Sequence, residues 1–538
     1  MAESVNESGV GSQSVSHARG ETEDRPIEAI IRHHARATPE LPAITFGDET
    51  FDYRAFNEWS DRIGHGLRDL GVGEGDRVAI VLKNCPEFFF TLLATRKIGA
   101  VQVAINWRYS AGEIAWIVND SKAEVLVVDP DLVAMADDIR KEVGRPIRLL
   151  VAGEASNGLE GLREWAMAYS AEDDMRVSAP GEVAIQLYTS GTSGWPKGAL
   201  ITNANIASYF RNADVAMPVW RNAAQLVLLP LFHVAALIGS LRTFSVGGHC
   251  VGQRTLDLDT VLRLIPRYRI NDLVTVNTVL AMMVEAASED IDFSSLQGII
   301  FGGGAISEQA ARKTMATFGC PLYSMYGSTE LTFGVTVLRI DDKLLETPEL
   351  LESCGLPMRE IEIAIFDAET GEAQPEGVDG ELWVRGGQRS LGYWGNPQAT
   401  KFAFREDGWF RTGDIGRIRD GYLYICDRLK DMVRSGGENV YPAEVERRLT
   451  EHPDVVEAIV FGVPDEKWGE AVHALVILRE GAKPLDTEII AFARQRLAPF
   501  KCPRAVEFVT DLPRTPSGKP RKNFIREKYW QGKRRKIA

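Results

Sequence analysis

The sequence has few cysteines, and none is placed for a zinc site or a disulfide framework. Six cysteines are scattered over 538 residues without a CxxC pair. Structural zinc sites and disulfide-stapled domains need characteristic cysteine spacings, so both classes are excluded. We therefore expect reduced thiols and a cytoplasmic protein.

The sequence also lacks a secretory signal and an unbroken hydrophobic span. It starts MAESVNESGVGSQS, with no basic region followed by an apolar one. Its longest apolar stretch, residues 223–241, is interrupted by Gln225, Pro230 and His233. This pattern predicts a strand, a turn and a helix, so no transmembrane segment is expected. Residues 1–25 are rich in Ser, Gly and Glu, which predicts a disordered tail.

Net positive charge is the third absence. The formal net charge is −14, and an acidic surface repels nucleic-acid backbones, so we expect no nucleic-acid partner. A local pocket can still be basic and bind a small phosphorylated ligand. The composition, 45% hydrophobic and 25% charged, is that of a globular protein, and the length predicts more than one domain.

Alternating patterns along the chain predict an α/β fold. Short β-branched runs, such as residues 77–82, 123–128, 183–188 and 298–301, alternate with helical stretches such as 86–93 and 307–318. This alternation is typical of parallel sheets. Strands with glycine-rich turns near 361–366 and 380–385 predict a β-rich subdomain. We expect a large N-terminal domain over residues 26–429 and a small mobile α+β domain over 430–538.

The most informative segment is YTSGTSGWPKG, residues 188–198, between a predicted strand and a helix that begins near Thr202. Backbone N–H groups, hydroxyls and Lys197 in such a loop can surround phosphate oxygens. It is not a Walker A loop, because GxxxxGK[ST] is absent. A generic Ser/Gly loop is more often a surface linker, but the position after a buried strand and the complete pattern favour phosphate binding.

The same segment resembles the phosphate loop of the adenylate-forming superfamily, which contains acyl-CoA synthetases, luciferases and peptide-synthetase adenylation domains. Ser193 stands where many members have Thr, which keeps the hydroxyl. Further matches follow in the family's order: YGSTE (326–330), Tyr393 to Gly395, RTGDIG (411–416), DRLKDMVRSGGENVYP (427–442) and PRTPSGK (513–519). The sequences of these motifs are most similar to those of bacterial fatty acyl-CoA synthetases.

The resemblance implies a nucleotide site. The residues carried over are Thr189, Ser190, Gly191, Thr192, Ser193, Gly194, Lys197, Gly303, Gly304, Ser324, Met325, Tyr326, Gly327, Thr329, Asp414, Arg428 and Lys519. It also implies Mg²⁺ binding by Glu330 and Thr192, since Mg²⁺ prefers oxygen ligands. Taken alone, a Thr-Glu pair more often starts a helix, Asp414 after a glycine more often marks a turn, and a lysine near a C-terminus is usually solvated.

The remaining roles also follow from the resemblance. Lys519, Lys197, Glu330 and His233 are the expected catalytic residues, and the expected acyl pocket comprises His233, Val234, Leu237, Gly304 and Gly334. Lys430 matches the pivot between domains. The loop of Ser435, Gly436, Gly437 and Glu438 matches the segment that contacts coenzyme A.

Together these features predict an ATP-dependent acyl-CoA synthetase that uses Mg²⁺ and coenzyme A, with a fatty acid as substrate. No carboxylate in residues 233–238 could pair with an α-ammonium, which disfavours amino acids. Alternatives are an aryl-acid CoA ligase, a luciferase-like enzyme and a non-catalytic nucleotide-binding homologue; Lys519, Glu330 and Asp414 argue against the last. A homodimer stays open.

Overall fold

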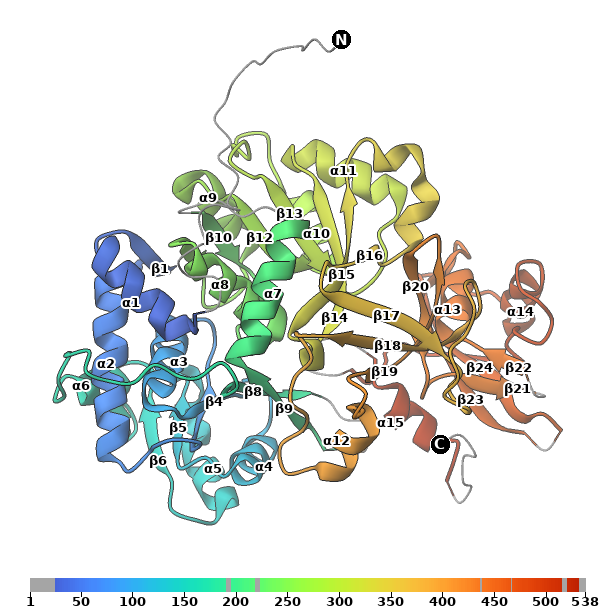
Figure 1. Ribbon diagram of the computed structural model, residues 1–538. Helices are drawn as coiled ribbons and strands as arrows, with labels where there is room; N and C mark the ends of the chain where they lie inside the picture. Colours follow the sequence, from blue (N-terminus) through green and yellow to red (C-terminus); the bar gives the residue numbers. More distant parts are fainter. Residues whose placement is uncertain are drawn as a thin grey trace, which may run out of the picture. The chain divides into compact units, whose positions relative to one another are not determined.

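The computed structural model describes residues 25–189, 195–217, 223–435, 438–465, 467–514 and 520–531. The chain divides into two compact units (Figure 1). The first comprises residues 1–362 and 385–408, and the second comprises residues 363–384 and 409–538.

One sheet of the first unit has the strand order β7-β6-β5-β3-β4-β8-β9. Its strands are β3 (Arg77–Val81), β4 (Val101–Ala104), β5 (Val125–Val128), β6 (Arg148–Val151), β7 (Glu160–Gly161), β8 (Val183–Thr189) and β9 (Lys197–Thr202). All neighbouring pairs are parallel except β8 and β9. Buried β-branched residues leave no polar face for solvent, so helices cover the sheet.

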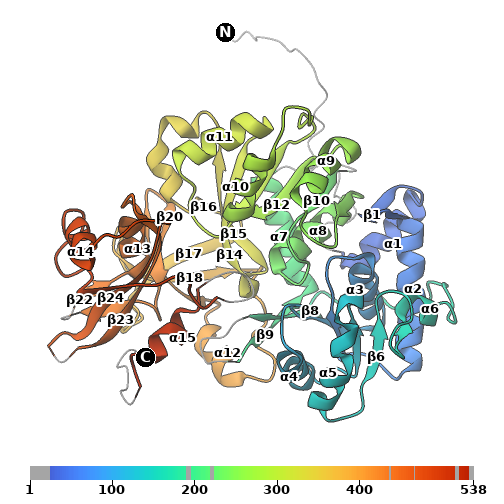
Figure 2. The same ribbon diagram turned by 180° about the vertical axis from the view of Figure 1, so that it is seen from behind.

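Helices α4 (Ala111–Ser121) and α5 (Ala136–Val143) pack on this sheet through a common apolar core (Figure 2). A capping box between Ser110 and Glu113 starts α4. The remaining helical segments near this sheet are α2 (Tyr53–Asp69), α3 (Pro86–Ile98), η2 (Pro130–Met135) and α6 (Leu162–Ala166). Pro86 stands in the first turn of α3, and Gly99 ends it with a φ of 77°.

The second sheet of this unit has the order β16-β15-β14-β13-β12-β10-β11-β1-β2. Its strands are β1 (Pro42–Phe46), β2 (Glu49–Asp52), β10 (Ala224–Val227), β11 (His249–Gly252), β12 (Asp272–Val276), β13 (Gly298–Gly302), β14 (Leu322–Ser328), β15 (Phe333–Ile340) and β16 (Leu356–Pro357). Strands β10 to β14 run parallel, so loops after their carboxyl ends gather at one edge, where ligands of such sheets bind.

The other helices of the first unit are α1 (Ile27–Ala37), α7 (Asn203–Ala216), α8 (Val234–Ser245), α9 (Leu258–Tyr268), α10 (Asn277–Ala286), α11 (Glu308–Phe318) and α12 (Pro397–Ala403). Short 3-10 turns, η3 (Thr329–Leu331), η4 (Leu344–Glu346) and η5 (Pro348–Glu352), complete the unit. Thr202 and Asn205 form the capping box that starts α7.

The second unit contains a β-rich sheet and a small α+β sheet. The first has the order β17-β18-β19-β20, with β17 (Ile361–Phe366), β18 (Gly380–Gly386), β19 (Phe410–Arg419) and β20 (Tyr422–Arg428). The other comprises β21 (Val433–Ser435), β22 (Glu438–Val440), β23 (Val455–Asp465), β24 (Gly469–Leu478) and β25 (Ala505–Phe508). Its helices are α13 (Pro442–Thr450), α14 (Asp486–Arg494) and α15 (Lys522–Glu527).

The expected fold class is confirmed: the protein has a large α/β part built on parallel sheets, a β-rich sheet and a small α+β C-terminal part. The apolar stretch 223–241 forms β10 and α8, as expected. Among the residues that the structure describes, no helix is long and apolar enough to cross a membrane. The β-rich sheet falls mainly in the second unit. The expected domains, residues 26–429 and 430–538, and the pivot at Lys430 stay predictions.

Candidate active site

The segment that carries the expected phosphate loop is held at both ends by an antiparallel strand pair. Thr189 at the end of β8 pairs with Lys197 at the start of β9, and Tyr188 pairs with Gly198. The helix expected near Thr202 is confirmed as α7, which has Thr202 as its N-cap, whereas the strand β9 before it was not expected. Ser190, Gly191, Thr192, Ser193 and Gly194 lie outside the described residues, so their roles stay predictions.

Aromatic side chains fix the base of this segment. Trp195 stacks on Trp116 of α4, with ring centroids 4.7 Å apart and an angle of 12° between the rings. The Tyr188 hydroxyl donates to Asp120 at 2.5 Å, and the Trp394 indole donates to the Asp120 carbonyl at 2.9 Å. No local sequence pattern indicates these contacts, because they join α4 to segments far away in the sequence.

Glu330 lies beside this segment, on the 3-10 turn η3 that follows β14. Its Oε1 accepts a hydrogen bond from the Tyr393 hydroxyl at 2.9 Å and a longer one from the Thr189 hydroxyl at 3.4 Å. The Lys197 ammonium lies 5.1 Å from the centroid of the Tyr393 ring. Burial, followed by the nearby Glu330 charge, raises the pKa of Tyr393, so this hydroxyl stays a donor. Four residues, from three segments far apart in the sequence, thus meet at one place.

The geometry fits a magnesium ion bound mainly by substrate oxygens. Glu330 offers carboxylate oxygens, and Thr189 adds a hydroxyl. Within the described ranges, no three His, Cys, Asp or Glu side chains gather to hold a metal ion. Mg²⁺ in nucleotide enzymes is commonly held by one or two carboxylates together with phosphates and water. A site of this kind needs no larger group of protein ligands.

The YGSTE segment begins in a strand and ends in a short turn. Tyr326 and Gly327 belong to β14, where the register with β15 shifts between them. A Cβ on Gly327 would lie 1.8 Å from the Phe333 carbonyl oxygen, so no larger residue fits. Thr329 and Glu330 start a short 3-10 turn, which agrees with the tendency of such a pair to begin a helix.

The glycines after β13 have the backbone that their residue type allows. Gly303 and Gly304 have φ values of 94° and 152°, which other residues rarely adopt. The Asn277 amide donates to the Gly304 carbonyl at 2.8 Å. Ser324 and Met325 lie on the neighbouring strand, opposite Phe301 and Gly302. These expected nucleotide positions therefore lie at the same edge of the large sheet, near the start of η3.

The expected acyl-pocket residues come from three elements. His233 immediately precedes α8, and its ring lies 4.3 Å from that of Phe232. Val234 and Leu237 lie on α8, where Leu237 is fully buried. Gly334 lies on β15, where a Cβ would come within 2.1 Å of the Met325 methyl group. Whether these side chains line one cavity stays a prediction.

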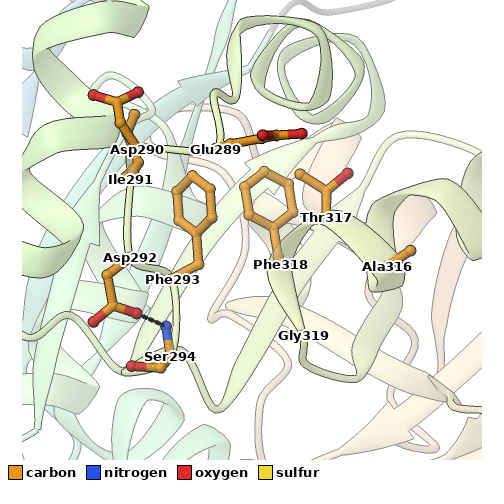
Figure 3. A pocket seen from close by; sticks show the side chains of 10 residues that line it. All are labelled: Glu289, Asp290, Ile291, Asp292, Phe293, Ser294, Ala316, Thr317, Phe318 and Gly319. Carbon is orange, nitrogen blue, oxygen red and sulfur yellow. Dashed lines mark hydrogen bonds between the residues drawn. The ribbon is translucent and has the colours of Figure 1, made fainter.

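A surface pocket elsewhere on the first unit contains none of these residues. Its volume is about 510 Å³, and it lies between the end of α11 and the loop before β13 (Figure 3). It is lined by Glu289, Asp290, Ile291, Asp292, Phe293, Ser294, Ala316, Thr317, Phe318 and Gly319. Asp290 pairs with Arg263 at 3.0 Å, and Asp292 accepts the Ser294 N–H at 2.9 Å. Its acidic wall is unsuited to a carboxylate or a nucleotide.

In the second unit, Asp414 and Arg428 face each other across β19 and β20. Arg428 Nε lies 2.8 Å from Asp414 Oδ1, and Asp414 is almost fully buried. Asp414 therefore belongs to a strand and not to a turn. The family resemblance implies that both residues belong to the nucleotide site, and the structure brings them together. Their contacts with ribose or phosphate stay predictions.

Lys430 follows β20 and is half-buried; burial lowers the pKa of its ammonium. Its carbonyl accepts a hydrogen bond from Arg526 of α15 at 3.2 Å. Ser435 on β21 pairs with Glu438 on β22. Gly436, Gly437 and Lys519 lie outside the described residues, so the coenzyme A loop and the adenylation lysine stay predictions.

Two family models match the chain. The AMP-binding enzyme model matches residues 31–394, and the model of the AMP-binding enzyme C-terminal domain matches residues 444–519. The first match covers more than half of this chain, so the chain belongs to the AMP-binding enzyme family.

Relatives and solved structures match nearly the full length. A fatty acid–[acyl-carrier-protein] ligase of Streptomyces coeruleorubidus is 32% identical, over 94% of this chain and 96% of its own. A feruloyl-CoA synthase of an Amycolatopsis species is 35% identical, over 92% and 97%. A long-chain-fatty-acid–CoA ligase of Mycobacterium tuberculosis is 33% identical, over 93% and 98%. The solved structure of Bacillus subtilis O-succinylbenzoate coenzyme A synthetase, with ATP and magnesium ion, is 27% identical, with a TM-score of 0.80 over 93% and 98%.

The predicted family and enzyme class are therefore confirmed. The chain is an AMP-forming acid–thiol ligase of the acyl- and aryl-CoA ligase group, with ATP, Mg²⁺ and coenzyme A as its cofactor and co-substrates.

Proposed function

We propose that this ligase activates a fatty acid as its acyl-adenylate and transfers the acyl group to coenzyme A. The observation that carries the proposal is the meeting of Thr189, Lys197, Glu330 and Tyr393 at the ends of the phosphate-loop segment. These residues offer a cation for phosphate oxygens and a carboxylate for the metal.

The reaction has two steps. A free carboxylate is a poor electrophile, so its oxygen first attacks the α-phosphorus of ATP, and the bond to the departing pyrophosphate breaks. The thiol sulfur then attacks the acyl carbon, and AMP leaves with the oxygen that came from the acid. Such phosphoryl transfer depends on positioning and charge neutralisation more than on a protein nucleophile.

Each side chain of the cluster has a defined part in the first step. Lys197 neutralises phosphate oxygens, and the Tyr393 hydroxyl orients the Glu330 carboxylate. Magnesium, when bound at Glu330, supplies charge neutralisation at the phosphates. We assign Lys519 as a further cation for the α-phosphate region, and His233 to the boundary between acid and phosphate, both on the family resemblance.

The residues before and within α8 favour an acid without an α-amino group. Residues 233–238 contain no carboxylate, and an unpaired ammonium beside Leu237 would cost several kcal/mol. Two of the named relatives act on fatty acids, which supports an aliphatic chain. The feruloyl-CoA synthase supports an aryl acid as the second candidate.

A panel of acids tests this proposal. Pyrophosphate release should be followed with fatty acids of graded length, hydroxycinnamic acids and amino acids, each with coenzyme A and with an acyl carrier protein. The highest kcat/KM is expected for a fatty acid with coenzyme A. A hydroxycinnamic acid that gives the highest value would establish the aryl alternative, and an amino acid would overturn the assignment of the pocket.

Three further assignments belong to the proposal. Residues 430–538 act as a mobile domain that pivots at Lys430, with Ser435, Gly436, Gly437 and Glu438 contacting coenzyme A. The protein works in the cytoplasm, in keeping with its scattered cysteines. A homodimer is also possible, and a measurement of the mass of the protein in solution distinguishes a monomer from a dimer.

A further inference from the structure

Between Glu330 and Gly334 lie two consecutive residues with left-handed backbone. Thr332 has a φ of 55° and Phe333 a φ of 106°. Residues with a Cβ rarely adopt such angles, and β-branched and bulky ones least of all. A strained pair of this kind persists only where the surrounding structure enforces it, and such pairs cluster at functional sites. The contacts of this segment should therefore show what enforces it.

Gln388 contacts the chain on both sides of the strained pair. It lies two residues beyond the end of β18 and is fully buried. Its Nε2 donates to the Leu331 carbonyl at 3.2 Å and to the Gly334 carbonyl at 2.7 Å. The Thr332 hydroxyl donates back to the Gln388 carbonyl at 2.7 Å. Gln388 thus bridges the turn that carries Glu330 and the first residues of β15.

The Gln388 amide is itself held in place by α7. Asn212, also fully buried, donates from Nδ2 to Gln388 Oε1 at 2.7 Å and accepts the Glu360 N–H at 2.9 Å. Two residues beyond Gln388, the Ser390 N–H donates to the Glu330 carbonyl at 2.8 Å. A buried polar network with its donors and acceptors paired is rigid, and a broken member is costly.

We propose that Gln388 is a positioning residue, which enforces the strained Thr332–Phe333 turn and so sets the places of Glu330 and Gly334 together. This inference rests on the proposed function, in which Glu330 binds the metal and Gly334 borders the acid. Gln388 touches neither ligand in this scheme. Its loss should therefore weaken the use of Mg²⁺ and of the acid together, whereas most single changes near one ligand would affect only that ligand.

The test compares two buried glutamines of the first unit. Gln388→Met keeps an unbranched side chain of similar length but removes the amide. Gln102→Met, on β4, is the matched control, because Gln102 is equally buried and, among the described residues, its amide has no hydrogen-bond partner. Acid-dependent ATP–pyrophosphate exchange is measured against Mg²⁺ and against acid, with thermal unfolding of both variants.

Gln388→Met should raise the Mg²⁺ concentration for half-maximal exchange about tenfold, as loss of a residue that orients a metal ligand typically does. The KM for the acid should rise with it. Gln102→Met should change neither. The inference is wrong if Gln388→Met lowers the melting temperature but leaves both values at those of the wild type, since the role would then be structural only.

A second variant covers a failure to fold. If Gln388→Met gives no folded protein, Asn212→Ala is used in its place, because it keeps the Gln388 amide but removes the side chain that holds it. A rise in both the Mg²⁺ concentration for half-maximal exchange and the KM for the acid supports the inference, and unchanged values overturn it. The wild type separates this inference from the proposed function. If no acid supports exchange in the wild type, the proposed function fails; if exchange occurs but the variants match the wild type, only the role of Gln388 fails.

Discussion

The hydrogen bond from Tyr393 to Glu330 offers a direct test of the metal-binding carboxylate. Tyr393→Phe removes the hydroxyl that donates to Glu330 Oε1 at 2.9 Å but keeps the ring that lies 5.1 Å from the Lys197 ammonium. A hydrogen bond to a charged group contributes about 1.5–3 kcal/mol. Because both residues are only partly buried, we take the lower value. About 1.4 kcal/mol is a factor of ten, so the Mg²⁺ requirement should rise roughly tenfold.

The assay is acid-dependent ATP–pyrophosphate exchange as a function of Mg²⁺. Tyr323→Phe, in the buried part of β14, is the control for loss of a tyrosine hydroxyl. Tyr323→Phe should leave the Mg²⁺ dependence unchanged. If Tyr393→Phe also leaves it unchanged, Tyr393 does not orient the metal-binding carboxylate, and Glu330 loses its main structural support for that role.

Other predictions concern stability, half-reactions and the loop. Burial lowers the pKa of His249 to about 4, so the folded protein favours neutral His249 and its free energy of unfolding should fall by about 2–3 kcal/mol as the pH drops from about 6.5 to 4. Urea unfolding should show this pH dependence in the wild type but not in His249→Gln. Lys519→Ala should slow acyl-adenylate formation about a hundred- to a thousandfold but spare thioester formation from added acyl-adenylate, whereas Lys430→Pro should do the reverse; equal slowing of both steps in single-turnover kinetics would refute separate roles. Trp195→Ala removes the stack on Trp116 and should raise the KM for ATP more than it lowers kcat, and a kcat effect alone would contradict an anchoring role.

Local sequence patterns predicted the elements whose form depends on near neighbours. Ser307 caps α11, which ends at Phe318 as expected. Pro86 begins α3, because a proline is suited to the first turn of a helix. The run at residues 361–366 forms β17 with the expected bounds. In these cases capping, periodicity and β-branched composition agree with the tertiary structure.

Contacts between distant segments could not be predicted in this way. The strand β9 was missed, because its pairing with β8 closes a loop whose Ser and Gly residues indicate only irregular structure. Tyr326 and Gly327 belong to β14 because they pair with β15, and no local pattern indicates that pairing. Nothing local to Gln388 indicates that its amide bridges Leu331 and Gly334. Tyr393 matches the family pattern, but the pattern assigns it no role. Its role is inferred from its hydrogen bond to Glu330.

The central claim is that the acid's own oxygen attacks the α-phosphorus of ATP. The most direct test uses a fatty acid labelled with ¹⁸O in its carboxylate, together with ATP, Mg²⁺ and coenzyme A, and analyses the products by mass spectrometry. The account predicts AMP that carries one ¹⁸O atom in its phosphate, in equal amount with the thioester. Thioester formation with ADP and labelled inorganic phosphate, or with unlabelled AMP, would contradict it.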